Sequence, residues 1–76
     1  MQIKISNTEE YVDVVSTTII GDSNNYTIVY ETKHRYVNAE EIEDVVDSGN
    51  LHRTLVVLEN MIKNNKYIKF DIVLKW

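Results

Sequence analysis

The chain has 76 residues, no cysteine and a formal net charge of −4 at pH 7. Its length accommodates a single domain, residues 1–76, and the absence of cysteine excludes a disulfide framework and a thiolate metal site. Hydrophobic residues make up 43% of the chain and charged residues 26%, which is typical of a globular protein rather than a disordered one. This net negative charge disfavours binding to nucleic-acid phosphates and to anionic lipid, and it favours basic partners.

The N-terminus has neither the basic start nor the apolar stretch of a signal peptide, and no apolar run approaches the roughly 18 residues of a membrane span. We therefore expect a cytoplasmic protein without a membrane partner. Ile, Lys, Asn and Tyr are abundant and proline is absent. This usage indicates an AT-rich genome, such as that of a low-GC bacterium or one of its phages.

The N-terminal half has the composition of β-strands. Residues 1–5 alternate apolar and polar side chains, and Val, Thr, Ile and Tyr dominate residues 11–20 and 26–37. Residues 21–25, Gly-Asp-Ser-Asn-Asn, are turn formers, so the two longer segments predict a β-hairpin. A helix over residues 8–16 stays open as an alternative to a strand, because Tyr11, Val12 and Val15 suit both periodicities.

The C-terminal half predicts two helices and a strand. Asn38 followed by Glu41 has the spacing of a capping box, and the next residues predict a short acidic helix that ends at Gly49. Four apolar residues at spacings of four, three and four then predict a helix that faces the core and ends near residue 64: Leu51, Leu55, Leu58 and Ile62. Residues 68–76 alternate as in a half-buried strand.

These elements predict an α+β fold in the order β-β-β-α-α-β. We expect an antiparallel sheet of three to four strands with both short helices packed on one face. The pattern leaves open which of the first three strands pairs with the last one.

No catalytic or metal-binding pattern is present. His34 and His52 are isolated from the residue types that would complete a nucleophilic or zinc site, and two glycines are too few for a phosphate-binding loop. We expect no enzymatic activity, no metal and no cofactor. The two predicted helices have the outline of a helix-turn-helix, but the acids of the first helix would repel a DNA backbone, so double-stranded DNA is not an expected partner.

The predicted acidic helix is the leading candidate for a binding site. At about 100° per residue, its outward acids fall within one arc and lack basic neighbours. These acids are Glu40, Glu43, Asp44 and Asp47. Such a stripe could occupy a basic groove meant for nucleic acid, although a solvated helix start also favours acids. Val56, on the polar side of the second predicted helix, is a second candidate partner contact or an incidental surface valine.

The sequence thus favours a small, acidic, non-enzymatic protein-binding module. We expect an inhibitor or regulator of the phage or mobile-element type, anti-defence or antitoxin-like, that acts as a nucleic-acid mimic and docks on a basic partner such as a nucleic-acid-processing complex. One alternative is a weak single-stranded nucleic-acid binder that stacks bases on the strand from Tyr26 to Tyr36, with Lys33 and Arg35 on the backbone. Another is a homo-oligomeric structural or assembly protein that pairs through sheet edges, with Trp76 at the interface.

Overall fold

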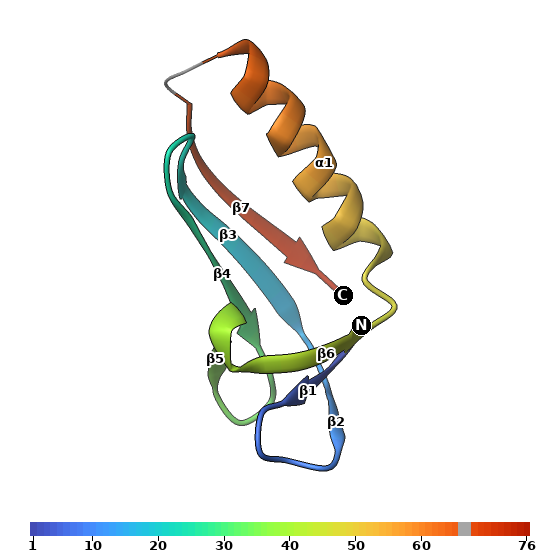
Figure 1. Cartoon of the computed structure of the whole chain (residues 1–76). Helices are drawn as coiled ribbons and strands as arrows, with labels where there is room; N and C mark the ends of the chain where they lie inside the picture. The colour runs from blue at the N-terminus through green and yellow to red at the C-terminus, as the bar shows by residue number, and fades with distance from the viewer. Residues whose placement is uncertain (66–67) are drawn as a thin grey trace.

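The computed structural model describes residues 1–65 and 68–76 and contains two antiparallel sheets and one α-helix (Figure 1). The three-stranded sheet has the order β2-β1-β6, and the four-stranded sheet has the order β5-β4-β3-β7. The elements are β1 (Gln2–Ile5), β2 (Tyr11–Asp13), β3 (Ser16–Asp22), β4 (Tyr26–Glu31), β5 (Tyr36–Asn38), the 3-10 helix η1 (Ala39–Glu41), β6 (Ile42–Val46), α1 (Gly49–Asn64) and β7 (Lys69–Lys75).

The α+β class is confirmed, but the predicted order is wrong. Within the described residues there is one α-helix instead of two. Each long predicted strand is divided, residues 11–20 into β2 and β3 and residues 26–37 into β4 and β5. The open alternative of a helix over residues 8–16 is not formed, because Tyr11–Asp13 pairs with β1 as a strand.

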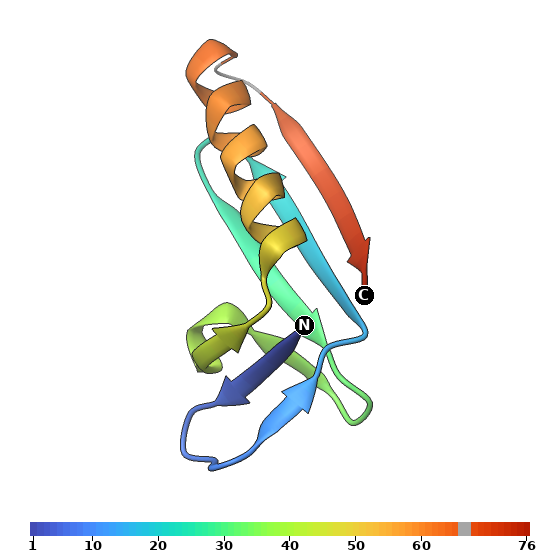
Figure 2. The ribbon, with the colours of Figure 1, turned by 90° about the vertical axis from the view of Figure 1, so that its right-hand side faces the viewer.

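Helix α1 covers one face of the four-stranded sheet (Figure 2). The predicted core-facing stripe is confirmed at three of its four residues, since Leu51 and Leu58 are buried and Leu55 packs against the same cluster. The fourth, Ile62, is partly buried near the C-terminal end of the helix. The helix begins directly after its N-cap residue Ser48. The three-stranded sheet lies beyond the N-terminal end of α1, at the opposite end of the molecule from the helix C-terminus (Figure 1).

The core joins both sheets and the helix. Ile3 from β1, Ile19 from β3 and Val37 from β5 are fully buried, and Tyr30 from β4 is 5% exposed. Because these side chains come from four strands of the two sheets, neither sheet has a separate core.

The hairpin between β3 and β4 forms as predicted. Its turn is an Asx turn, in which the Asp22 carboxylate accepts hydrogen bonds from the backbone N–H groups of Asn24 at 2.9 Å and Asn25 at 3.0 Å. Gly21 has φ +147°, and a Cβ there would lie 2.6 Å from the Cα of Tyr26. This position therefore requires glycine.

The predicted acidic helix is replaced by η1 and β6. The capping-box contact does form, with the Asn38 N–H donating to Glu41 Oε2 at 3.0 Å, but it caps only the three residues of η1. Strand β6 then pairs with β1, with a register shift that leaves Glu43 without a partner in β1. This β-bulge places Ile42 and Val45 on the same face although they are three residues apart. The helix-like spacing in the sequence is thus the spacing of a bulged strand.

The buried stripe of α1 gives a direct test of the fold. We expect Leu58→Ala to lower the free energy of unfolding by about 2 to 5 kcal/mol, because Leu58 is 3% exposed and its loss leaves a cavity in the single core. The matched control is Val57→Ala, one residue earlier and 56% exposed, which should change stability by no more than about 0.5 kcal/mol. Urea unfolding of both variants measures the difference, and equal stabilities would contradict the observed helix face.

Candidate functional site

The three-stranded sheet has one buried and one exposed face. On the buried face, Ile3 lies opposite Val12 in β2 and Val45 in β6. Residues that alternate with these point outward. We call the outward set, with the bulge residue Glu43, the acidic face: Gln2, Lys4, Tyr11, Asp13, Glu43, Asp44 and Val46.

The bulge in β6 brings two acids to the same lysine. Lys4 lies opposite Asp44 in the β1–β6 register, and its Nζ is 3.5 Å from Oε2 of Glu43. The side chain of Glu43 remains 52% exposed in this ion pair. One lysine therefore neutralises the acidic face only in part, since Asp13, Glu43 and Asp44 all belong to it.

Tyr11 fixes the carboxylate of Asp44 from across β1. Its hydroxyl donates a hydrogen bond to Asp44 Oδ2 at 2.5 Å, and the backbone N–H of Val45 donates to Oδ1 at 2.9 Å. These two hydrogen bonds hold the pKa of Asp44 below its ordinary value, and the bond from the Tyr11 hydroxyl has the larger effect. The contact therefore stabilises the folded chain at neutral pH, and this stabilisation is lost as the pH falls through the lowered pKa.

Asp13 is held on the other outer strand of the same sheet. The side-chain amide of Gln2 donates to its Oδ1 at 2.9 Å. The acidic face thus carries one acid on β2 and two on β6, separated by β1.

The predicted site residues do not form a helical stripe. Glu43 and Asp44 are brought together on the acidic face, while exposed Glu40 belongs to η1 and exposed Asp47 follows β6 with φ +59°. Among the described residues, neither Glu40 nor Asp47 shares a hydrogen bond or ion pair with the acidic face. The stripe fails because only residues 39–41 are helical, while residues 42–46 extend along a strand.

Val56 lies apart from these acids. It is 43% exposed, as a surface position requires, but it belongs to α1 over the other sheet.

Sequence reasoning missed Lys4 and Tyr11. Their only sequence signal is the alternation of β1 and β2, which says that they face outward but not that β6 lies beside them. Asp13 is also absent from the predicted stripe, and the β1–β2 register places it on the acidic face opposite Gln2.

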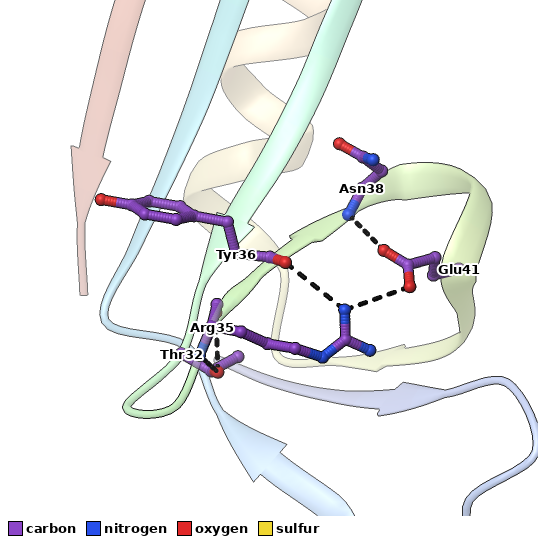
Figure 3. Close-up of polar contacts among 5 residues, drawn as sticks. All are labelled: Thr32, Arg35, Tyr36, Asn38 and Glu41. Carbon is purple, nitrogen blue, oxygen red and sulfur yellow. Dashed lines mark hydrogen bonds and ion pairs between the residues drawn. The ribbon is translucent and has the colours of Figure 1, made fainter.

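A second polar cluster holds the chain between β4 and η1 (Figure 3). Arg35 Nη1 donates to Glu41 Oε1 at 3.1 Å and to the carbonyl of Tyr36 at 3.4 Å. The Asn38 N–H and then the Arg35 guanidinium lower the pKa of Glu41. The Thr32 hydroxyl accepts from the Arg35 N–H at 3.2 Å and donates to the Arg35 carbonyl at 2.9 Å, which closes the turn.

The tyrosines of the strand that was expected to stack bases lie on different faces of the sheet. Tyr30 is in the core, and Tyr36 is on the opposite face of the sheet, where its hydroxyl donates to Glu31 at 3.4 Å. Arg35 is already paired with Glu41. The tyrosines of residues 26–36 therefore do not share one exposed face.

The histidines do not gather into a metal centre. His34 lines an open pocket of about 210 Å³ between β2 and the turn after β4, with Tyr11, Asp13 and Lys33 on its walls. Across residues 1–65 and 68–76, no three His, Cys, Asp or Glu side chains are grouped so that they could hold a metal ion. Within the same residues, α1 is too short and too polar to cross a bilayer.

Comparison of the chain with protein-family models, with curated proteins and with solved structures finds no match. Inferences about function therefore rest on the geometry and charge of the chain itself.

The Tyr11–Asp44 contact predicts an abnormal tyrosine titration. The hydrogen bond to Asp44 is the largest cause that raises the pKa of Tyr11 above its ordinary value of about 10. We expect Asp44→Ala to return the Tyr11 pKa toward that value, while the Tyr30 pKa stays raised by burial. NMR titration of ¹³C-labelled tyrosine rings measures both. The control Asp13→Ala should leave Tyr11 unchanged, and an unaltered Tyr11 titration in Asp44→Ala would refute the contact.

Proposed function

We propose that the protein is a small, non-enzymatic binding module that docks through its acidic face onto a basic surface of a partner protein. The observation that carries the proposal is the clustering of Asp13, Glu43 and Asp44 on one exposed sheet face with a single lysine among them. An exposed sheet face encloses no cavity, which suits contact with a protein surface better than enclosure of a small ligand.

The spacing of the acids suits a cluster of cations. Neighbouring strands lie about 4.8 Å apart, so the one acid of β2 is about 10 Å from the strand that carries the two acids of β6, with β1 between them. Lysine or arginine side chains of a partner could reach the acids of both strands from one helix or loop. Arginine forms paired hydrogen bonds with a carboxylate, so an arginine-rich surface gains orientation as well as charge.

Two features prepare the face for binding. Asp44 is already oriented by Tyr11 and by the Val45 N–H, so little side-chain freedom is lost when a partner binds. Its lowered pKa keeps it ionised well below neutral pH. The charge that the partner meets is therefore both fixed in place and permanent under physiological conditions.

A nucleic-acid-binding protein is the class of partner that this charge favours. Such proteins carry clustered lysine and arginine for contact with phosphates, and carboxylates on a rigid face can compete for the same cations. The proposed role is that of an inhibitor or regulator of such a partner, of the phage or mobile-element kind. The net charge of −4 disfavours direct binding to nucleic acid.

Variants with opposite expected effects test this proposal. Glu43→Lys should weaken binding at least about tenfold, because it replaces an attraction by a repulsion at the exposed bulge. Lys4→Gln should strengthen binding, since it removes the one cation of the acidic face. Glu59→Lys is the matched control, with the same charge change as Glu43→Lys at an exposed position of α1. Both reversed acids are exposed, so the fold should survive.

The partner is captured from a bacterial lysate at low salt and eluted with high salt, and its affinity for each purified variant is then measured by calorimetry at several salt concentrations. Affinity should fall as salt rises through the physiological range, where charges are screened over about 8 to 10 Å. Equal losses in Glu43→Lys and Glu59→Lys would contradict docking through the acidic face. An affinity independent of salt would contradict the electrostatic mechanism.

A further inference from the structure

Strand β7 forms a long, open edge of the four-stranded sheet. It pairs along its seven residues with β3, and no strand of the described chain pairs with its other side. In Figure 2 it borders the sheet, while α1 lies over the neighbouring strands. The remaining edges are less suited to pairing, since β2 and β5 have three residues each and β6 is interrupted by its bulge.

The register identifies the backbone groups that face this open edge. At the two ends of the β3–β7 ladder, the Trp76 N–H donates to the Val15 carbonyl at 3.0 Å, and the Ser23 N–H donates to the Ile68 carbonyl at 2.9 Å. Hydrogen-bonded pairs alternate in an antiparallel ladder, so every second residue between these ends bonds to β3. The intervening residues direct their N–H and C=O groups outward: Lys69, Asp71, Val73 and Lys75.

The side chains at this edge are incompletely covered. Val73, on the face away from α1, is 54% exposed. On the face toward α1, four large apolar side chains are only half-buried: Phe70, Ile72, Leu74 and Trp76. The edge therefore offers apolar area on both faces together with unpaired backbone groups.

The charges of β7 complement those of a second β7. When two copies pair in antiparallel fashion about Val73, Asp71 of each copy lies opposite Lys75 of the other, and the two Val73 side chains meet. Opposite charges on facing residues stabilise a strand pair, and like charges destabilise it. An edge strand whose charges served only to prevent association would carry charges of one sign. The charges at positions 71 and 75 have opposite signs, so each attracts its counterpart in the second copy.

The apolar residues match in the same register. Phe70 lies opposite Trp76 of the second copy, and Ile72 lies opposite Leu74. All of these residues are on the face toward α1, where they pack against the core and are only partly buried. Pairing therefore brings the partly buried apolar residues of the two copies into contact. Each hydrogen-bonded pair exchanges two bonds, which gives about six new backbone hydrogen bonds across the edge.

Neighbouring registers are less favourable. A one-residue shift would place buried faces against exposed ones. Pairing about Ile72 sets Lys69 against Lys75, and pairing about Asp71 sets that carboxylate against its own copy. Pairing about Phe70 matches Lys69 with Asp71, but it sets Lys75 against residue 65, which lies before β7.

We propose that β7 is a homodimer interface, with a second copy of the chain as its occupant, paired in antiparallel fashion about Val73. The dimer is a continuous sheet twice as wide as that of one copy, and both α1 helices lie on the same face. The acidic face belongs to the other sheet and remains free, so this interface is independent of the proposed partner binding.

Charge exchange between two positions tests both the interface and its register. Asp71→Lys and Lys75→Asp, made separately, should each raise the dimer dissociation constant at least about tenfold, because each sets two like-charged pairs across the dyad. Mixing the two variants should restore a dimer that contains one copy of each, since lysines at 71 and 75 then face aspartates. Lys69→Asp is the control and should dimerise as the parent does, because Lys69 has no facing residue within 68–76 in this register.

Sedimentation velocity from micromolar to millimolar concentration measures the association state, and native mass spectrometry identifies the mixed dimer. A parent chain that stays monomeric throughout would overturn the proposal. So would a Lys75→Asp variant that dimerises like the parent, or a mixture that yields no mixed dimer. Glu43→Lys should leave the dimer intact, which separates this result from that of the partner-binding experiment.

Discussion

Pairing of β6 with β1 through the bulge at Glu43 organises the three-stranded sheet. The extra residue lets Ile42 and Val45 both face the core while Glu43 and Asp44 both reach the exposed side of the sheet. Without the bulge, strict alternation would place one of the apolar side chains outside or one of the acids inside. The acidic face and one wall of the core therefore depend on the same irregularity.

Sequence periodicity predicted the elements whose contacts are simple. The alternation of residues 68–76 gave β7, the stripe from Leu51 to Leu58 gave α1, and the turn at Asp22 gave the hairpin. Periodicity predicted the wrong structure for residues 39–47. The capping contact of Asn38 and Glu41 and the spacing of Ile42 and Val45 both suit a helix, but most of the segment is a strand. What favours the strand is its pairing with β1, some 40 residues away in the chain, and local pattern carries no information on that contact. Glu43 and Asp44 were consequently recognised as candidates but placed on the wrong scaffold.

The two proposed surfaces lie on different sheets and would bind through different kinds of interaction. The acidic face presents fixed charge, and binding through it should be fast, steered by charge and sensitive to salt. The β7 edge offers backbone hydrogen bonds, apolar area and self-complementary charge. A dimer paired through β7 carries two acidic faces. A partner with two or more basic surfaces would therefore bind the dimer with higher affinity, because the second contact forms within the same complex.

The acidic face and the core beneath it both require residues 42–46 to form a strand beside β1. NMR spectroscopy of the labelled chain tests this directly through the Cα chemical shifts of these residues and the nuclear Overhauser effects across the sheet. The structure predicts strand-like shifts, with contacts that link Ile3 to Val45 and Ile5 to Ile42. Helical shifts over residues 40–47, with contacts between residues three apart and none to β1, would contradict it.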